Sequence, residues 1–204
     1  MQMNKAVLAI IVVLIVLGGI YYWYYLRQPE EKNLPFNEGV TQLNAIWGNN
    51  GISAKELNDD AALSAIQESR LNSLKGDLTD FKVGLAYYTK TEDIDKLNEL
   101  AGIEIDLVDA SIARKNVLDG VAFLESLNYD PDKMCSNTSK IDNILKDIED
   151  SYTKTNFYNE ELASFTASNP GQASSAGIKA LTMSTSTPQI SDLKGSFNEF
   201  KAYC

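Results

Sequence analysis

The side chains best placed to do chemistry are three oxygen ligands at alternate positions, Asn128, Asp130 and Asp132. This spacing opens the calcium-binding loop of an EF-hand, in which alternate residues supply oxygen ligands. The later positions depart from that loop, because Lys133 stands where the sharp-turn glycine belongs and Ser139 where the bidentate glutamate belongs. The three residues are therefore a weak calcium candidate, and residues that stop a helix before a proline explain the same pattern. We otherwise expect no metal site.

Histidine is absent from all 204 residues. Its absence excludes a Ser-His-Asp triad, a Cys-His pair, a two-histidine metal site and a haem held by histidine. The sequence also contains no glycine-rich phosphate loop, Walker sequence or zinc-type cysteine cluster. We therefore predict that the protein is not an enzyme and that it has no catalytic residue and no cofactor.

Some carboxylates and aromatic residues could still form a site if they were buried together. Paired carboxylates do acid–base chemistry when their surroundings separate their pKa values, but we expect those of this chain to form a solvated helix face. Trp47, Tyr87 and Tyr88 could line a ligand cleft, and we expect them instead in the core or covering one end of a helical bundle. The carboxylates concerned are Glu104, Asp106, Asp109, Glu160 and Glu161.

The two cysteines, Cys135 and Cys204, are predicted to form a disulfide. Cys135 precedes an expected helix, and residues 172–203 can run back along that helix and return the chain to it. The bond would close a loop of about 70 residues, for which chain entropy predicts about 4 kcal/mol of stabilisation. The pair is not a C-x-x-C motif and has no histidine to activate a thiolate, so we expect no catalytic use. Two free thiols are the alternative.

The elements that would position these residues begin with an apolar run at residues 6–26, after a short tail of residues 1–5. A helix of 21 residues is about 31 Å long, which matches a hydrocarbon core of about 30 Å. No small-x-small cleavage site follows the run, so we predict an uncleaved signal anchor that crosses the membrane once. Its aromatic end suits the headgroup level and consists of Tyr21, Tyr22, Trp23, Tyr24 and Tyr25.

The processing and the orientation of this segment allow alternatives. Lys5-Ala6 before the apolar run loosely resembles the processing site of archaeal pilin-type precursors, which implies a filament subunit whose hydrophobic helix packs in the filament core. The flanking charges, Lys5 on one side and Arg27 with Lys32 on the other, do not decide the orientation. The disulfide and the glycosylation-type triplet at Asn137 favour a domain outside the membrane, and a cytoplasmic domain is the alternative.

The rest of the chain is predicted to be all-α, with a polar linker at 27–36 and a helical domain at 37–204. A short amphipathic helix ends near residues 48–51. Capping boxes, Ser53 with Glu56 and Thr89 with Glu92, then open long helices over about 54–88, with a possible interruption at 58–60, and from about 90 to 128. A third helix covers about 137–168, and a last one begins at Thr187. These four arms predict an N-terminal transmembrane helix followed by an elongated up-down four-helix bundle with one short extra helix.

A weak internal repeat relates two of these arms. Residues 71–82 read LNSLKGDLTDFK and residues 190–201 read ISDLKGSFNEFK. Gly76 and Gly195 both fall in mid-helix, where glycine costs about 1 kcal/mol relative to alanine. We expect close approach of a neighbouring backbone at both glycines, unless the similarity is coincidental.

The anchor, the long bundle and the absence of catalytic motifs together predict a structural or interaction protein. All 28 acidic residues and 16 of the 18 basic residues lie after Arg27, which gives that part a charge of −12 and disfavours nucleic acid as a partner. We predict a membrane-anchored structural or protein-interaction subunit at the cell membrane, bound to the bilayer through residues 6–26 and to a protein partner or to itself. A ligand-binding sensor domain is the alternative, since the extracytoplasmic four-helix bundles of bacterial receptors look broadly similar.

Overall fold

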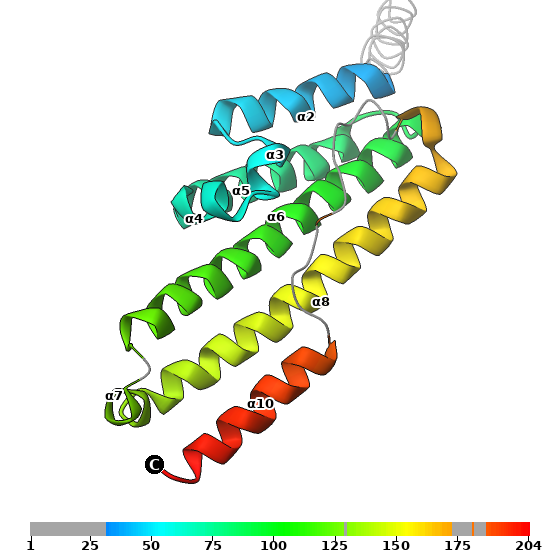
Figure 1. Ribbon diagram of the computed structural model, residues 1–204. Coiled ribbons are helices and arrows are strands. Elements are labelled where there is room, and N and C mark those ends of the chain that lie inside the picture. Colours follow the sequence, from blue (N-terminus) through cyan, green and yellow to red (C-terminus); the bar gives the residue numbers. More distant parts are fainter. Residues whose placement is uncertain (1–31, 129, 173–180, 182–186) are drawn as a thin grey trace, which may run out of the picture. The chain divides into compact units, whose positions relative to one another are not determined.

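The structure, a computed structural model, describes residues 32–128, 130–172, 181 and 187–204. Within them every assigned element is a helix, and the long helices pack together, which confirms the all-α prediction (Figure 1). The elements are α2 (Phe36–Asn50), α3 (Ala54–Leu57), α4 (Asp60–Ala65), α5 (Glu68–Gly84), the 3₁₀ turn η2 (Leu85–Tyr87), α6 (Glu92–Ser126), α7 (Pro131–Cys135), α8 (Thr138–Ser168) and α10 (Thr187–Lys201).

The chain divides into two units, Met1–Asn33 and Leu34–Cys204. The predicted anchor at 6–26, its tail and its aromatic residues from Tyr21 to Tyr25 lie outside the described residues. Among the residues that are described, no helix combines the length and the apolar character needed to cross a membrane. Leu34 and Phe36, which the sequence pattern assigns to the linker, are buried in the second unit.

The helices from α5 onward alternate in direction, and α6 and α8 form the most extensive contact (Figure 1). Lys75 of α5 binds Asp109 of α6 at 2.7 Å, and Gly120 of α6 faces Ile144 of α8. Helices α2 and α5 pack on the N-terminal half of α6, whereas α10 packs on the N-terminal half of α8. The sequence pattern predicts four arms of about 30–37 residues each, whereas among the described helices only α6 and α8, with 35 and 31 residues, reach that length.

The largest core cluster lies where α2, α5, α6 and the C-terminal half of α8 meet. Its members recur at three- and four-residue intervals along each helix, which is the spacing of one buried helical face. Fully buried members include Leu43, Leu74, Leu97, Leu107 and Phe165. Among the described side chains the cluster contains none from α10, whose buried Phe197 lies outside it, so that helix depends on other interactions.

The region predicted as one helix over 54–88 is divided into three. The first break was expected near residues 58–60, and there Asp59 caps α4 by accepting the N–H of Ala62 at 2.9 Å. The second break was not predicted: Ile66 is extended, with φ −74° and ψ 129°, and its side chain is buried. Helical periodicity continues through this break because Leu63 and Ile66 both enter the core, so the apolar pattern alone does not reveal it.

The cations of α6 hold the short helices in place. Arg114 donates to the backbone oxygen of Leu57 at 2.7 Å and to the carboxylate of Asp60 at 2.6 Å. Lys115 donates to the backbone oxygen of Ser64 at 2.9 Å. These bonds satisfy carbonyl groups near the ends of α3 and α4, which have no partner inside such short helices.

The two predicted capping boxes have different outcomes. The first is confirmed, since Ser53 accepts the N–H of Glu56 at 3.3 Å and the Glu56 carboxylate accepts the N–H of Ser53 at 2.7 Å. The second, Thr89 with Glu92, is wrong. Thr91 is the cap of α6 and accepts the N–H of Ile94 at 3.3 Å. This register places three acidic residues in the first turn of α6, where the helix dipole favours them.

Glycines mark close helix contacts, but not at the positions predicted from the repeat. A methyl group at Gly76 or Gly195 would meet nothing within 4 Å, so neither glycine is required by a neighbouring backbone. At Gly39 of α2, by contrast, a methyl group would lie 2.9 Å from Cγ of Leu97 and closer to both Cδ atoms. Leu97 is fully buried, so its side chain has little room to move away.

Gly39→Ala should therefore destabilise the protein, by about 1–3 kcal/mol for overpacking of a filled contact. Gly76→Ala is the matched control, and it should stabilise by up to about 1 kcal/mol because alanine is the better helix former. Urea unfolding of the full chain in detergent, followed by circular dichroism, measures both. Equal effects of the two substitutions would contradict the close contact of α2 with α6.

The predicted disulfide is present: Cys135 and Cys204 are bonded, with their Cα atoms 5.3 Å apart. It joins α7 to the residues after α10. The remaining attachments of α10 to α8 include two ion pairs, Lys201 with Asp142 at 2.6 Å and Lys194 with Glu149. Partly exposed ion pairs of this kind stabilise little, and α10 also buries Phe197, so the disulfide acts together with an apolar contact to hold α10.

Cys135→Ser combined with Cys204→Ser should release α10 more than any other helix. The chain-entropy estimate for a separation of 69 residues is about 4 kcal/mol. Hydrogen exchange should accelerate in residues 191–203, with a much smaller change in residues 92–110 of α6, whose packing does not involve α10. Uniform acceleration in both segments would show that the disulfide stabilises the domain as a whole.

Candidate functional site: a buried acid between three helices

Three helices contribute one polar side chain each to the interior of the domain. These are Trp47 of α2, Glu104 of α6 and Tyr158 of α8, and all three are buried. Glu104 follows Ala101 by three residues and precedes Val108 by four, so the helical period of α6 directs it into the core. The site is thus built at the junction of the three helices by the same pattern that builds the core.

A hydrogen bond joins the first two residues. The indole N–H of Trp47 donates to Oε2 of Glu104 at 2.8 Å. Glu104 is only 2% exposed, and removal of its carboxylate from water raises its pKa from 4.5 to about 7, although the Trp47 hydrogen bond acts in the opposite direction. Burial disfavours the charged form of an acid, which explains the sign of the shift.

The charge of Glu104 affects the ionisation of Tyr158. Its pKa is raised by burial and, to a lesser extent, by the negative charge of Glu104. Thr155 lies one turn before it in α8, and its buried Oγ1 has no hydrogen-bond partner among the described residues. An unsatisfied buried hydroxyl costs about 1–3 kcal/mol. The Thr155 hydroxyl therefore lowers the stability of the folded protein.

The arrangement can bind and release a proton near neutral pH. Chemistry on a solute would need an opening to Glu104. A hollow of about 320 Å³ among the described residues lies elsewhere and is open and mainly polar. Its lining consists of Pro35, Phe36, Asn37, Asp93, Gly171 and Gln172, and it includes none of Trp47, Glu104 and Tyr158.

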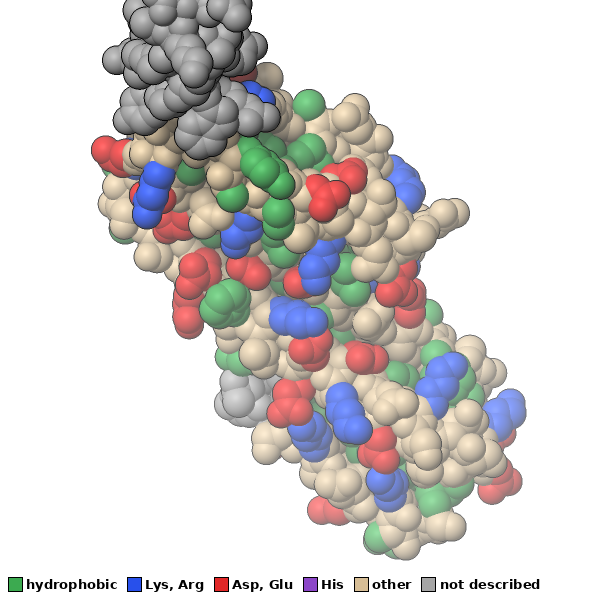
Figure 2. All heavy atoms as spheres, turned by 180° about the vertical axis from the view of Figure 1, so that it is seen from behind, with side chains coloured by type: hydrophobic (Ala, Val, Ile, Leu, Met, Phe, Trp, Pro, Cys, Tyr) green, Lys and Arg blue, Asp and Glu red, His purple; other side chains and the backbone are tan. Residues whose placement is uncertain are grey.

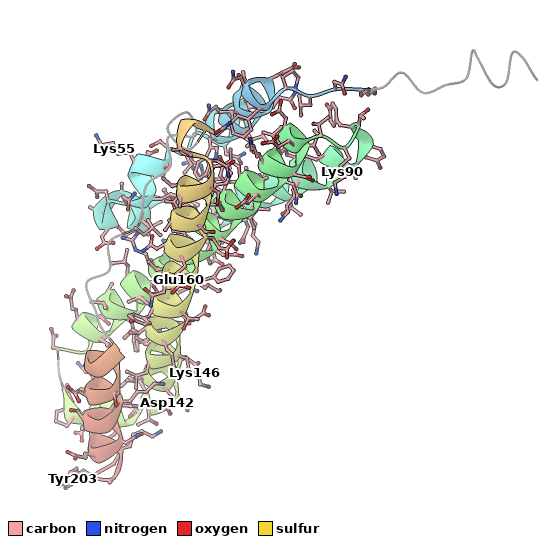
Figure 3. The ribbon with its side chains drawn as sticks, turned by 90° about the vertical axis from the view of Figure 1, so that its right-hand side faces the viewer. Lys55, Lys90, Asp142, Lys146, Glu160 and Tyr203 are labelled. Carbon is pink, nitrogen blue, oxygen red and sulfur yellow. A yellow bond between two sulfur atoms is a disulfide. The ribbon has the colours of Figure 1, made fainter. Side chains whose placement is uncertain are left out.

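The expectation of a solvated carboxylate face is wrong for Glu104 and holds for Glu160, which is exposed on α8 (Figure 3). Asp106 is half-buried, and its pKa is raised first by burial and then by Asp109 and Glu161, against the opposing effect of Lys82 and Lys75. Glu104 lies three residues after Ala101 and four before Val108, and this helical spacing could have predicted its burial from the sequence. The sequence pattern did not identify Trp47 as its partner, because the two lie 57 positions apart.

The calcium candidate lies between α6 and α7. Asp130 caps α7, and its Oδ1 accepts the N–H groups of Asp132 and Lys133 at 3.0 and 3.3 Å. Asn128 has a positive φ of 51°, as expected for a residue that ends a helix. In the described parts of the chain, no group of three or more acidic, cysteine or histidine residues could hold a metal ion. The turn thus gives Asp130 a helix-capping role.

The glycosylation candidate Asn137 is half-buried at the start of α8. Its side-chain nitrogen, the atom that would carry a sugar, donates to the backbone oxygen of Lys133 at 2.8 Å.

Tyr87, expected in the core or over an end of the bundle, is 80% exposed, whereas Trp47 is in the core as expected.

On the face drawn in Figure 2, acidic and basic side chains are interspersed over the described helices. Comparison with models of known protein families gives no match, and neither curated proteins nor solved structures match the chain. The function is therefore argued from this chain alone.

Glu104 should make stability depend on pH between 5 and 8. Its raised pKa means that the folded protein binds the proton more tightly than the unfolded chain. The stability it contributes is complete below pH 4.5 and falls as the pH rises to about 7, by up to about 3 kcal/mol at about 1.4 kcal/mol per unit. Glu104→Gln keeps a hydrogen-bond acceptor for Trp47 and should flatten the curve. Urea unfolding of the full chain in detergent at half-unit pH steps measures the slope.

The matched control is Glu160→Gln, which changes an exposed carboxylate and should leave the slope unchanged. The absence of histidine simplifies the measurement, because no imidazole titrates in this range. The interpretation fails if Glu104→Gln and Glu160→Gln retain the same slope as the unaltered chain.

Proposed function

We propose that the protein is a non-enzymatic, membrane-anchored structural or protein-interaction subunit that presents an acidic helical domain outside the membrane. The apolar run at 6–26 supports an anchor. The observation that carries the proposal is how soon the folded core follows that run. Leu34 is buried, so only residues 27–33 separate the apolar segment from the core.

The first residues of the second unit are held in place by its own contacts. Phe36 is buried, and its backbone N–H donates to the carboxylate of Asp93 at 3.1 Å. Seven residues span at most about 25 Å when fully extended. The domain is thereby kept close to the bilayer, with α2 as the short extra helix and α5, α6, α8 and α10 as the alternating helices of the bundle.

The disulfide supports an external location, since bonds of this kind persist in oxidising compartments and are rare in the cytosol. The acidic surface supports a partner with a basic contact face, because complementary charge speeds association and disfavours wrong partners. Phe157 of α8, which is exposed and lies three residues from the exposed Glu160, offers an apolar contact in that setting.

The anchor and its orientation can be tested together in cells. The protein should remain in the membrane fraction after carbonate extraction, and a chain lacking residues 6–26 should not. A membrane-permeant maleimide should label Cys135 and Cys204 only after a reductant is added, both in intact cells and in lysates. Thiols that are labelled without reductant, and only after lysis with an impermeant reagent, would contradict the external location.

The interaction part needs a separate measurement. Purification in a mild detergent should recover a second protein or a defined oligomer, identified by mass spectrometry and light scattering. A monomer without a stable partner would refute the role as an interaction subunit, while the membrane fractionation would still report on the anchor.

A further inference from the structure

Two strongly exposed apolar side chains lie one helical turn apart at the end of α5 and in η2. Val83 is 62% exposed and Tyr87 is 80% exposed. Residues four apart lie on the same side of a helical turn, and the exposed Lys90 follows three positions later. A methyl group at Gly84 would meet nothing within 4 Å, so this side of the turn is open.

This pair lies at the end of the domain where the chain enters it. The turn η2 packs on α6 and leads into its first residues. Asp93, in the first turn of α6, accepts the N–H of Phe36 at 3.1 Å, and Phe36 is the first residue of α2. Figure 3 shows Lys90 at this end and Tyr203 at the opposite end of the domain.

We propose that Val83, Tyr87 and Lys90 form a contact surface for the zwitterionic phospholipid headgroups of the membrane that holds residues 6–26. This inference rests on the proposed anchor. The linker of residues 27–33 reaches at most about 25 Å, and it enters the domain at the end where Val83 and Tyr87 lie. The surface at that end is therefore the one that can meet the bilayer without a longer tether.

The chemistry of the three side chains fits the headgroup level. Tyrosine places an apolar ring and a polar hydroxyl across the boundary between acyl chains and water, and it is enriched there. Lysine covers apolar surface with its methylenes while its ammonium group stays in water. Val83 adds apolar area on the same side as Tyr87.

The charges at this end identify the kind of lipid. Nζ of Lys90 lies 3.9 Å from Oδ1 of Asp95, and Nζ of Lys96 lies 2.6 Å from Oε1 of Glu92. With Asp93, the acidic groups of the first turn of α6 outnumber the two lysines. A strongly anionic surface would repel this end, so the contact depends on Tyr87 and Val83 rather than on charge attraction.

Photocrosslinking of the full chain in phosphatidylcholine vesicles tests the inference. Tyr87 is replaced by the photoreactive p-benzoylphenylalanine, which is close to tyrosine in shape. The matched control carries the same replacement at Tyr203, which is 89% exposed at the opposite end of the domain. After irradiation, mass spectrometry should find lipid adducts at position 87 and none above the unirradiated background at position 203. A Val83→Ser substitution should lower the yield at position 87.

The outcomes separate this inference from the anchor on which it rests. A chain that floats with the vesicles but forms no adduct at position 87 overturns the contact surface and leaves the anchor standing. Equal yields at positions 87 and 203 also overturn it, because they indicate random collision with lipid. A chain that does not float overturns the anchor itself. In phosphatidylglycerol vesicles the yield at 87 should fall, and a rise would overturn the assignment to zwitterionic headgroups.

Discussion

Burial of the N-terminal half of α6 is the interaction on which the described domain depends. Helices α2, α4, α5 and α8 and the turn η2 all pack against α6. Its side chains Leu97, Leu100 and Leu107 are almost completely removed from water, and each such side chain contributes about 1.5–3 kcal/mol on transfer. The shortest of these elements, α4 with six residues and η2 with three, cannot be stable alone, because isolated helices under about 12–15 residues are marginal in water. Their stability is therefore tertiary and is supplied by α6.

The same burial explains the polar groups inside. A helix enclosed on several sides has few solvent-facing positions, so Glu104, Ser111 and Lys115 are buried with the leucines. Ser111 donates to the backbone oxygen of Leu107 at 2.7 Å and Lys115 to that of Ser64. Burial raises the pKa of Glu104 to about 7, so this core position can bind a proton near neutral pH. The domain thus carries a titrating group without histidine.

The sequence predicted those features that depend on local pattern and composition. It gave the helical class, the first capping box and the pairing of Cys135 with Cys204, because caps, periodicity and loop length are readable along the chain. It missed the break at Ile66, since the buried face continues through the break. It also missed the partnership of Trp47 with Glu104, which depends on how α2 lies on α6. Nothing in the sequence indicates that position 39 requires a glycine. The structure does, because the side chain of Leu97 leaves no room there for a methyl group.

The entry of the chain at Leu34 and Phe36 also has a mechanical consequence. A pulling force applied to the chain at Asn33 would reach the domain first through α2, since Leu34 and Phe36 are buried and Phe36 is bonded to Asp93. Peeling α2 away would withdraw Trp47 from Glu104 and admit water to the carboxylate. A pulling force at Asn33 and ionisation of Glu104 would then favour the same opened state, so that either one lowers the work required for the other.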